Sequence, residues 1–159
     1  MEPNQKPIII GYDGSPASDM AVEAAAELFA PRKTLIVTVW EPEQAWTAIA
    51  PAGTITPVPI DVRVGFELEQ ALYEGAQRNA RRGAELAEKG GLDAEPTVVA
   101  DKITVAETLV RLAEEHDAAA IVLGSHGHNA LREVLLGSTT RDVLKKAPCP
   151  AVVVREPKD

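Results

Sequence analysis

The chain has 159 residues, the length of one ordinary domain, and 45% of them are hydrophobic while 25% are charged, a composition typical of a folded globular protein. Its 24 acidic residues outnumber 16 lysines and arginines, giving a formal net charge of -8, which argues against a general nucleic-acid-binding or anionic-membrane surface. We therefore expect a single domain spanning residues 1–159 that holds any anionic ligand locally.

The cysteine content and the N-terminal sequence bear on location. The single cysteine, Cys149, excludes an intramolecular disulfide and fits a reducing compartment. The N-terminus lacks the apolar core of a signal peptide, and no apolar run approaches the ~18 residues of a membrane span. These features predict a cytoplasmic protein without membrane association.

Five short segments are apolar and rich in β-branched residues, which predicts strands at 6–12, 34–40, 95–100, 118–124 and 150–156. Most of them lack the polar alternation of a half-exposed sheet. Continuous apolar strands separated by helical patterns indicate an α/β fold, in which helices cover both faces of a parallel sheet. We expect four helices in the four intervals between the strands.

Each predicted helix has its own signals. Ser15 can cap the first helix, and Pro31 stops it. The second, at about 65–89, carries an apolar series at i, i+4 spacing and ends at two glycines. Thr104 opens the capping box of the third. The intervening segment 41–64, rich in Pro, Ala and Thr, is long for a loop and is expected to be flexible or to cover a ligand.

A glycine-rich stretch, GSHGHNALREVLLGSTTR at residues 124–141, follows the fourth predicted strand. In open α/β sheets, ligands bind at the carboxyl ends of the strands. Gly124 and Gly127 would let backbone N–H groups face a ligand, while Ser138 and Thr139 open the last helix, whose N-terminus attracts an anion. The spacing is G-x2-G-x9-G-S, which is neither the P-loop pattern nor the dinucleotide-binding pattern. It predicts a phosphate site.

This spacing, together with the stretches IIIGYDGSPAS, IVLGSHG and APCPAVVV, resembles the nucleotide-binding members of the universal stress protein family. The resemblance covers nearly the whole chain and is loose only from about 41 to 91. It implies a three-layer α/β/α open sheet of five parallel strands in the order 3-2-1-4-5, of the Rossmann-like, adenine nucleotide alpha hydrolase-like type. It also implies ATP as the ligand, in some cases with Mg²⁺, and a homodimer formed through the final strand at 150–156.

The resemblance also assigns roles to individual residues. It gives the ribose hydroxyls to Asp13 and the adenine to the backbone of Val39; the phosphates fall to Gly124, Gly127, Gly137, Ser138 and Thr139, with His126 nearby. An arginine is common in the family where His126 stands, and a neutral histidine compensates less of the phosphate charge than an arginine does. Asp13 has a second interpretation, because Asp-Gly-Ser-Pro also reads as a turn and helix cap.

Several other polar residues have a simpler structural interpretation. His126 and His128 form an H-x-H, but no third ligand lies nearby in sequence, so we do not expect a metal site built by histidine. Arg132 and Arg141 fall on helical segments, where a solvated or glutamate-paired role is at least as good as a phosphate contact. Cys149 stands between two prolines before an apolar strand and is expected to be a packed thiol.

The sequence favours a binding protein over an enzyme. It offers a phosphate cradle, but no evident catalytic base and no P-loop lysine, so no catalytic residue is assigned. The favoured hypothesis is an ATP-binding sensor or regulator of a stress response with an unknown signalling partner. Two alternatives stay open: a slow Mg²⁺-dependent ATPase of the same fold, and a dimeric interaction scaffold that binds no nucleotide.

Overall fold

The computed structural model describes residues 6–49, 59–125 and 136–156. Strands and helices alternate along most of this chain. Their bounds are β1 Ile8–Gly11, α1 Pro16–Phe29, β2 Lys33–Trp40, α2 Pro42–Ile49, α3 Val62–Lys89, β3 Asp93–Ala100, α4 Val105–Glu115, β4 Ala120–Gly124, α5 Ser138–Lys146 and β5 Ala151–Val154.

The five strands form one parallel sheet in the order β3-β2-β1-β4-β5, which confirms the predicted order. β1 lies at the centre, where Ile8 pairs with Thr34 of β2 and with Ala120 of β4. The strand order reverses beside β1, because the chain runs outward first to β3 and later to β5. In an open sheet this reversal leaves a crevice at the carboxyl ends of the central strands.

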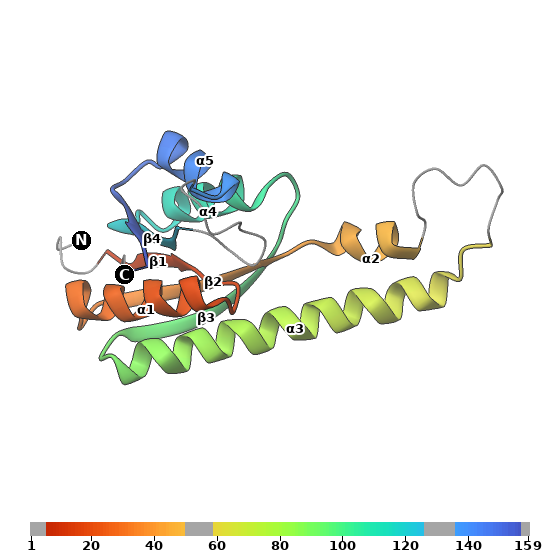
Figure 1. Ribbon diagram of the computed structural model, residues 1–159, viewed down its shortest axis with the longest axis horizontal. Helices are drawn as coiled ribbons and strands as arrows, with labels where there is room; N and C mark the ends of the chain where they lie inside the picture. Colours follow the sequence, from red (N-terminus) through yellow and green to blue (C-terminus); the bar gives the residue numbers. More distant parts are fainter. Residues whose placement is uncertain (1–5, 50–58, 126–135, 157–159) are drawn as a thin grey trace.

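Helices cover both faces of the sheet, α1 and α3 on one side and α4 and α5 on the other (Figure 1). Ile8 and Ile10 belong to the core beneath α1 and α3, whereas Ile9 belongs to the core beneath α4 and α5. All three side chains are fully buried. Successive strand residues point to opposite faces, so a strand buried on both faces is continuously apolar, as the sequence indicated.

The expected helix boundaries are present at three positions. The Ser15 hydroxyl accepts a hydrogen bond of 3.2 Å from the Ser18 N–H at the start of α1. The Thr104 hydroxyl accepts one of 3.1 Å from the Glu107 N–H at the start of α4. Gly90 caps the C-terminus of α3, and Gly91 follows with a φ of 93° that favours glycine.

The prediction for residues 41–64 was wrong in part. Among the described residues there are five helices rather than four, because α2 forms at Pro42–Ile49 and α3 begins at Val62 instead of 65. The Asp61 carboxylate caps the start of α3 by accepting a hydrogen bond of 3.0 Å from the Arg63 N–H. Trp46 stabilises α2, since its ring lies against α3 where Gly65 leaves room and meets the ring of Phe66 edge-on at 5.3 Å. Composition and loop length gave no indication of this tertiary contact.

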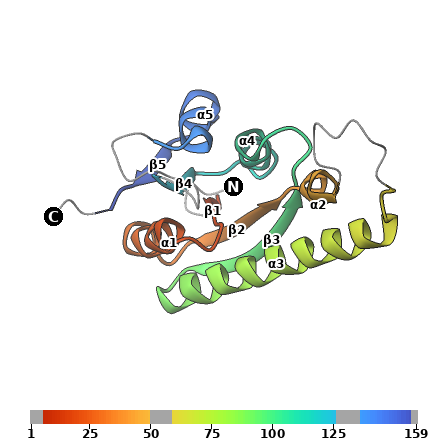
Figure 2. The same ribbon diagram turned by 45° about the vertical axis from the view of Figure 1, so that its right-hand side comes forward.

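The first half of α3 and the short α2 together extend beyond the carboxyl ends of β2 and β3 (Figures 1 and 2). We call this pair of segments, residues 42–49 and 62–75, the arm. Within the described parts of the chain, no helix has the length and apolarity needed to cross a membrane.

Candidate functional site

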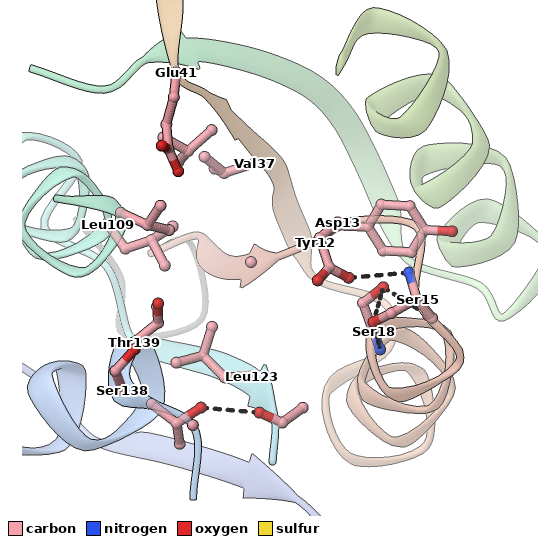
Figure 3. A pocket seen from close by; sticks show the side chains of 16 residues that line it. Tyr12, Asp13, Ser15, Ser18, Val37, Glu41, Leu109, Leu123, Ser138 and Thr139 are labelled. Carbon is pink, nitrogen blue, oxygen red and sulfur yellow. Dashed lines mark hydrogen bonds between the residues drawn. The ribbon is translucent and has the colours of Figure 1, made fainter. Parts of the chain in front are cut away.

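A cavity of about 510 Å³ opens at the carboxyl ends of β1, β2 and β4, at the crevice that the strand order creates. This volume falls within the range of roughly 300–1,000 Å³ that is usual for small-molecule sites. Figure 3 shows side chains converging on it from the sheet and from helices α1, α4 and α5. The lining residues are Gly11, Tyr12, Asp13, Ser15, Ser18, Val37, Val39, Glu41, Val105, Leu109, Leu123, Gly124, Gly137, Ser138, Thr139 and Thr140.

Most of the residues singled out in the sequence meet in this cavity. Those that line it are Asp13, Val39, Gly124, Gly137, Ser138 and Thr139. They come from segments far apart in the chain. Two further candidates, His126 and Gly127, lie outside the described residues, so their part in the site stays a prediction.

Asp13 occupies the loop between β1 and α1. One of its carboxylate oxygens accepts a hydrogen bond of 2.9 Å from the Ser15 N–H, the turn geometry that the sequence offered as the alternative interpretation. The same residue also lines the cavity, so its role in the turn and its place in the site are compatible. Gly14 follows with a φ of 78°, a conformation that favours glycine.

Helix α3 holds this loop from outside the cavity. The Asn79 amide donates to the Asp13 carbonyl at 3.3 Å, and Arg82 binds the Asp19 carboxylate at 2.6 Å. Asp19 also accepts a hydrogen bond of 2.6 Å from the Tyr12 hydroxyl. Burial, together with this hydrogen bond, raises the pKa of Tyr12 well above its usual value. The loop that carries Asp13 is therefore anchored by a network of half-buried and exposed polar contacts.

The backbone of Val39 faces the cavity because β2 continues past the end of β1. The last hydrogen bond between the two backbones is that of 2.9 Å from the Tyr12 N–H to the Val37 carbonyl, since the Tyr12 carbonyl accepts from the Thr38 hydroxyl at 2.8 Å. On the other edge, the Trp40 carbonyl accepts from the Asp101 N–H. Since alternate residues direct their N–H and C=O groups to the same edge, those of Val39 point to the side that β1 has left. This places one donor and one acceptor beside the cavity.

The N-terminus of α5 is attached to the end of β4 by two hydrogen bonds. The Gly137 N–H donates to the Ser125 carbonyl at 2.9 Å, and the Thr140 hydroxyl donates to the Gly124 carbonyl at 3.1 Å. The first N–H groups of a helix have no partner within it. Ser138 and Thr139 therefore reach the cavity together with the positive end of the α5 dipole.

The glycines at the two ends of this connection serve different purposes. A Cβ at Gly124 would stand 2.7 Å from the Ala17 carbonyl oxygen of α1, so packing between β4 and α1 requires glycine there. The sequence interpretation linked this glycine to a ligand and missed the packing contact. Gly137 has φ -57° and ψ 157°, a conformation that any residue adopts, so the backbone there does not require glycine.

The sequence interpretation named neither the residues of the apolar wall nor one acidic residue of the site. Val37, Leu109 and Leu123 form part of this wall. The alternation of side chains along β2 could have identified this acidic residue, because it places the side chain of Glu41 on the same face as those of Val37 and Val39. Among the described residues of the lining, Asp13 and Glu41 are the charged ones, so these carboxylates make the described lining acidic.

The remaining polar candidates lie away from the cavity or outside the described residues. Cys149 is half-buried, and burial raises the pKa of its thiol, which suits a packed, unreactive side chain. Arg141 lies within α5. His128 and Arg132 lie outside the described residues. In the described ranges, no group of three His, Cys, Asp or Glu side chains is placed to hold a metal ion.

Comparison with known sequences identifies relatives over nearly the whole chain. Residues 5–155 match the model of the universal stress protein family. Universal stress protein MJ0531 of Methanocaldococcus jannaschii is 30% identical over 154 residues, covering 96% of this chain and 84% of the relative. Universal stress protein Rv1996 of Mycobacterium tuberculosis is 32% identical over 163 residues, covering 99% of this chain and 46% of the relative. The chain thus spans about half the length of the mycobacterial relatives that it matches.

Comparison with solved structures identifies the same fold. The structure of the protein MJ0577 has a TM-score of 0.77 at 23% identity, covering 98% of this chain and 99% of that one. A universal stress protein from Archaeoglobus fulgidus in complex with dAMP has a TM-score of 0.61 at 23% identity, covering 94% and 98%. A universal stress protein in complex with cAMP has a TM-score of 0.62 at 23% identity, covering 95% and 97%.

Proposed function

Because the chain belongs to the universal stress protein family, we propose that it binds an adenine nucleotide, ATP, in the cavity at the carboxyl ends of β1, β2 and β4. Binding would make it a nucleotide-dependent sensor or regulator of a stress response. The nucleotide complexes of two proteins with the same fold, one with dAMP and one with cAMP, support the ligand class.

One observation carries the proposal: residues from three separate segments converge on one cavity in the order that a nucleotide requires. In Figure 3, Glu41 and Val37 lie at one end of the cavity, Ser138 and Thr139 lie at the other, and Asp13 lies at its side. The apolar end suits a base beside the Val39 backbone. Asp13 then accepts hydrogen bonds from the ribose hydroxyls, and the N-terminus of α5 receives the phosphates.

Gly137 supports the phosphate assignment. It lines the cavity as the N-cap residue of α5, although its backbone conformation is open to any residue. Backbone N–H groups can approach a phosphate closely where no Cβ intervenes. We propose that Gly124, Gly137, Ser138 and Thr139 form the described part of the phosphate cradle, to which His126 and Gly127 would contribute.

The acidic lining bears on how the phosphates are neutralised. Asp13, which lies at the side of the cavity between its two ends, would repel a triphosphate unless a cation lay between them. Mg²⁺ carried by the nucleotide supplies that charge, because this ion is commonly bound through phosphates and one or two carboxylates. Phosphoryl transfer also needs a base or a water-positioning group, and the lining provides no described residue placed for it. We therefore propose binding, rather than hydrolysis, as the function.

A homodimer through the final strand is part of the proposal. β5 lies at the margin of the sheet, and its four residues, Ala151–Val154, are only partly buried. An apolar edge strand with unpaired backbone groups tends to associate with another chain. We expect a dimer in light scattering, and a change of Val153 to lysine should shift it toward monomer.

Calorimetric titration tests the nucleotide assignment. ATP, ADP and AMP, with and without Mg²⁺, would be added to protein from which bound nucleotide has been removed. We expect ATP to bind the wild type, and Gly137→Val to weaken binding at least tenfold, about 1.4 kcal/mol, by filling the space above α5.

The matched control is Gly75→Val, because an added Cβ at Gly75 meets only the Arg78 guanidinium at 3.6 Å. Both variants must retain the circular dichroism spectrum of the wild type. A folded, nucleotide-free wild type that binds none of the three nucleotides would contradict the proposal and favour the interaction scaffold. Phosphate release that requires Mg²⁺ would favour the slow ATPase.

A further inference from the structure

We propose that Glu41 is a specificity-determining residue that selects adenine over 6-oxopurines, by accepting a hydrogen bond from the exocyclic amino group of the base. This inference rests on the proposed nucleotide function and adds to it a residue outside the glycine-rich motif. It concerns which base the cavity accepts. The alternation of side chains along β2 and the hydrogen bonds of the turn into α2 support it.

The position of Glu41 follows from strand alternation. Val37 and Val39 both direct their side chains into the core beneath α4 and α5, and residue 41 is the next in that series. Its side chain lines the same cavity as theirs. Figure 3 shows the carboxylate at the apolar end, near Val37 and across from Ser138. A nucleotide with its phosphates on α5 would therefore present its base to Glu41.

The turn into α2 holds this side chain in place. The Gln44 N–H donates to the Glu41 carbonyl at 3.1 Å, and the Gln44 side-chain amide donates to Oε2 of the Glu41 carboxylate at 2.7 Å. A carboxylate has roughly four acceptor positions on its two oxygens, so one bond from Gln44 does not exhaust it. The group is thus oriented by its own chain and can still accept a hydrogen bond from a ligand.

Adenine and 6-oxopurines carry opposite hydrogen-bonding groups at position 6 of the base, the position that would face Glu41. The adenine amino group has two hydrogens, one for the Val39 carbonyl and one for Glu41, while N1 accepts from the Val39 N–H. A 6-oxopurine has a carbonyl oxygen in place of the amino group. An ionised carboxylate is an acceptor only, so it would face that oxygen without a bond and repel it. Glu41 is exposed at the rim of the cavity, so it would discriminate through this lost hydrogen bond and through charge repulsion.

The experiment compares ATP with inosine triphosphate, which carries the 6-oxo group, by calorimetric titration of the nucleotide-free protein. The variant is Glu41→Gln, because glutamine keeps the length of the side chain and can both donate and accept. The matched control is Glu43→Gln, which removes the same charge from an exposed residue in the first turn of α2. Charge removal alone changes the affinity for both triphosphates together, so the ratio of the two affinities is the informative quantity.

We expect the wild type and Glu43→Gln to prefer ATP, and Glu41→Gln to reduce that preference about tenfold, in keeping with the loss of one hydrogen bond to a charged group. An unchanged ratio in Glu41→Gln would overturn the inference and leave Glu41 as a residue of the α2 turn, while the proposed function would stand. A wild type that binds neither triphosphate would overturn the proposed function and this inference together.

Discussion

The two halves of α3 belong to one continuous helix but are stabilised in different ways. At 1.5 Å per residue, its 28 residues span about 42 Å. The second half packs on the sheet through small residues, and Ala80, Gly83 and Ala87 are all buried there. In the first half, by contrast, Gly65 is the buried residue among those described, and this half projects with α2 as the arm (Figure 1).

Exposed apolar side chains concentrate on and beside the arm. Of the eight large hydrophobic residues that are exposed in the described parts of the chain, five lie between positions 60 and 73: Ile60, Val62, Val64, Phe66 and Tyr73. Aromatic pairs contribute to the packing of the arm, since Trp46 meets Phe66 and Trp40 meets Tyr73, each at 5.3 Å, and Ala45 of α2 is fully buried. Small residues that face the sheet thus fix the second half of α3, whereas contacts with α2, large rings among them, fix the first.

The largest expected effect comes from Gly83→Ala in the second half. A Cβ at this position would lie 2.7 Å from Cγ2 of Ile36 and 2.9 Å from the ring of Tyr12, so the helix would have to move away from the sheet. Overpacking of this kind costs about 1–3 kcal/mol. We expect the midpoint of urea unfolding to fall accordingly, with an unchanged m-value. An unaltered midpoint would show that α3 does not press on the sheet at this point.

Part of the candidate site was predictable from local signals in the sequence. Apolar segments indicated the strands, whereas the strand order and the choice of Asp13 and Val39 came from the resemblance to the universal stress protein family; together they placed both residues and the α5 N-terminus at the carboxyl ends of the strands. Hydrophobic pattern and cap residues suffice for such elements. The sequence did not reveal why residue 124 must be a glycine. An added Cβ there would lie 2.7 Å from the Ala17 carbonyl oxygen, and this distance depends on how two segments far apart in the chain pack together.

The arm was the least predictable region. Its composition indicates a loop, and α2 exists because Trp46 finds a groove over Gly65, with its indole N–H donating to Glu69 at 3.2 Å. Leu68 and Leu72 continue the apolar series of α3 but are only partly buried. A periodic apolar pattern predicts that a helix forms, but it does not predict how much of that helix packs on the sheet.

A smaller, local effect is expected from Trp46→Ala in the arm. It removes the ring contact with Phe66 and the hydrogen bond to Glu69, which together are worth about 1–2 kcal/mol of local stability. Hydrogen exchange should speed up in residues 42–49 and 62–70, while the second half of α3 keeps its protection. Equal acceleration in both halves would mean that the arm and the body unfold as one unit.

The smallest effect, and one of opposite sign, is expected from Gly75→Ala, the counterpart of Gly83→Ala at the end of the arm. The added methyl group has space, because its nearest neighbour is the Arg78 guanidinium at 3.6 Å. Replacing glycine by alanine inside a helix stabilises it by about 0.5–1 kcal/mol. A gain in the global free energy of unfolding would show that the arm melts together with the body. A gain confined to slower hydrogen exchange in residues 62–75 would make the arm a separate unit, and a loss of stability would contradict a continuous helix through Gly75.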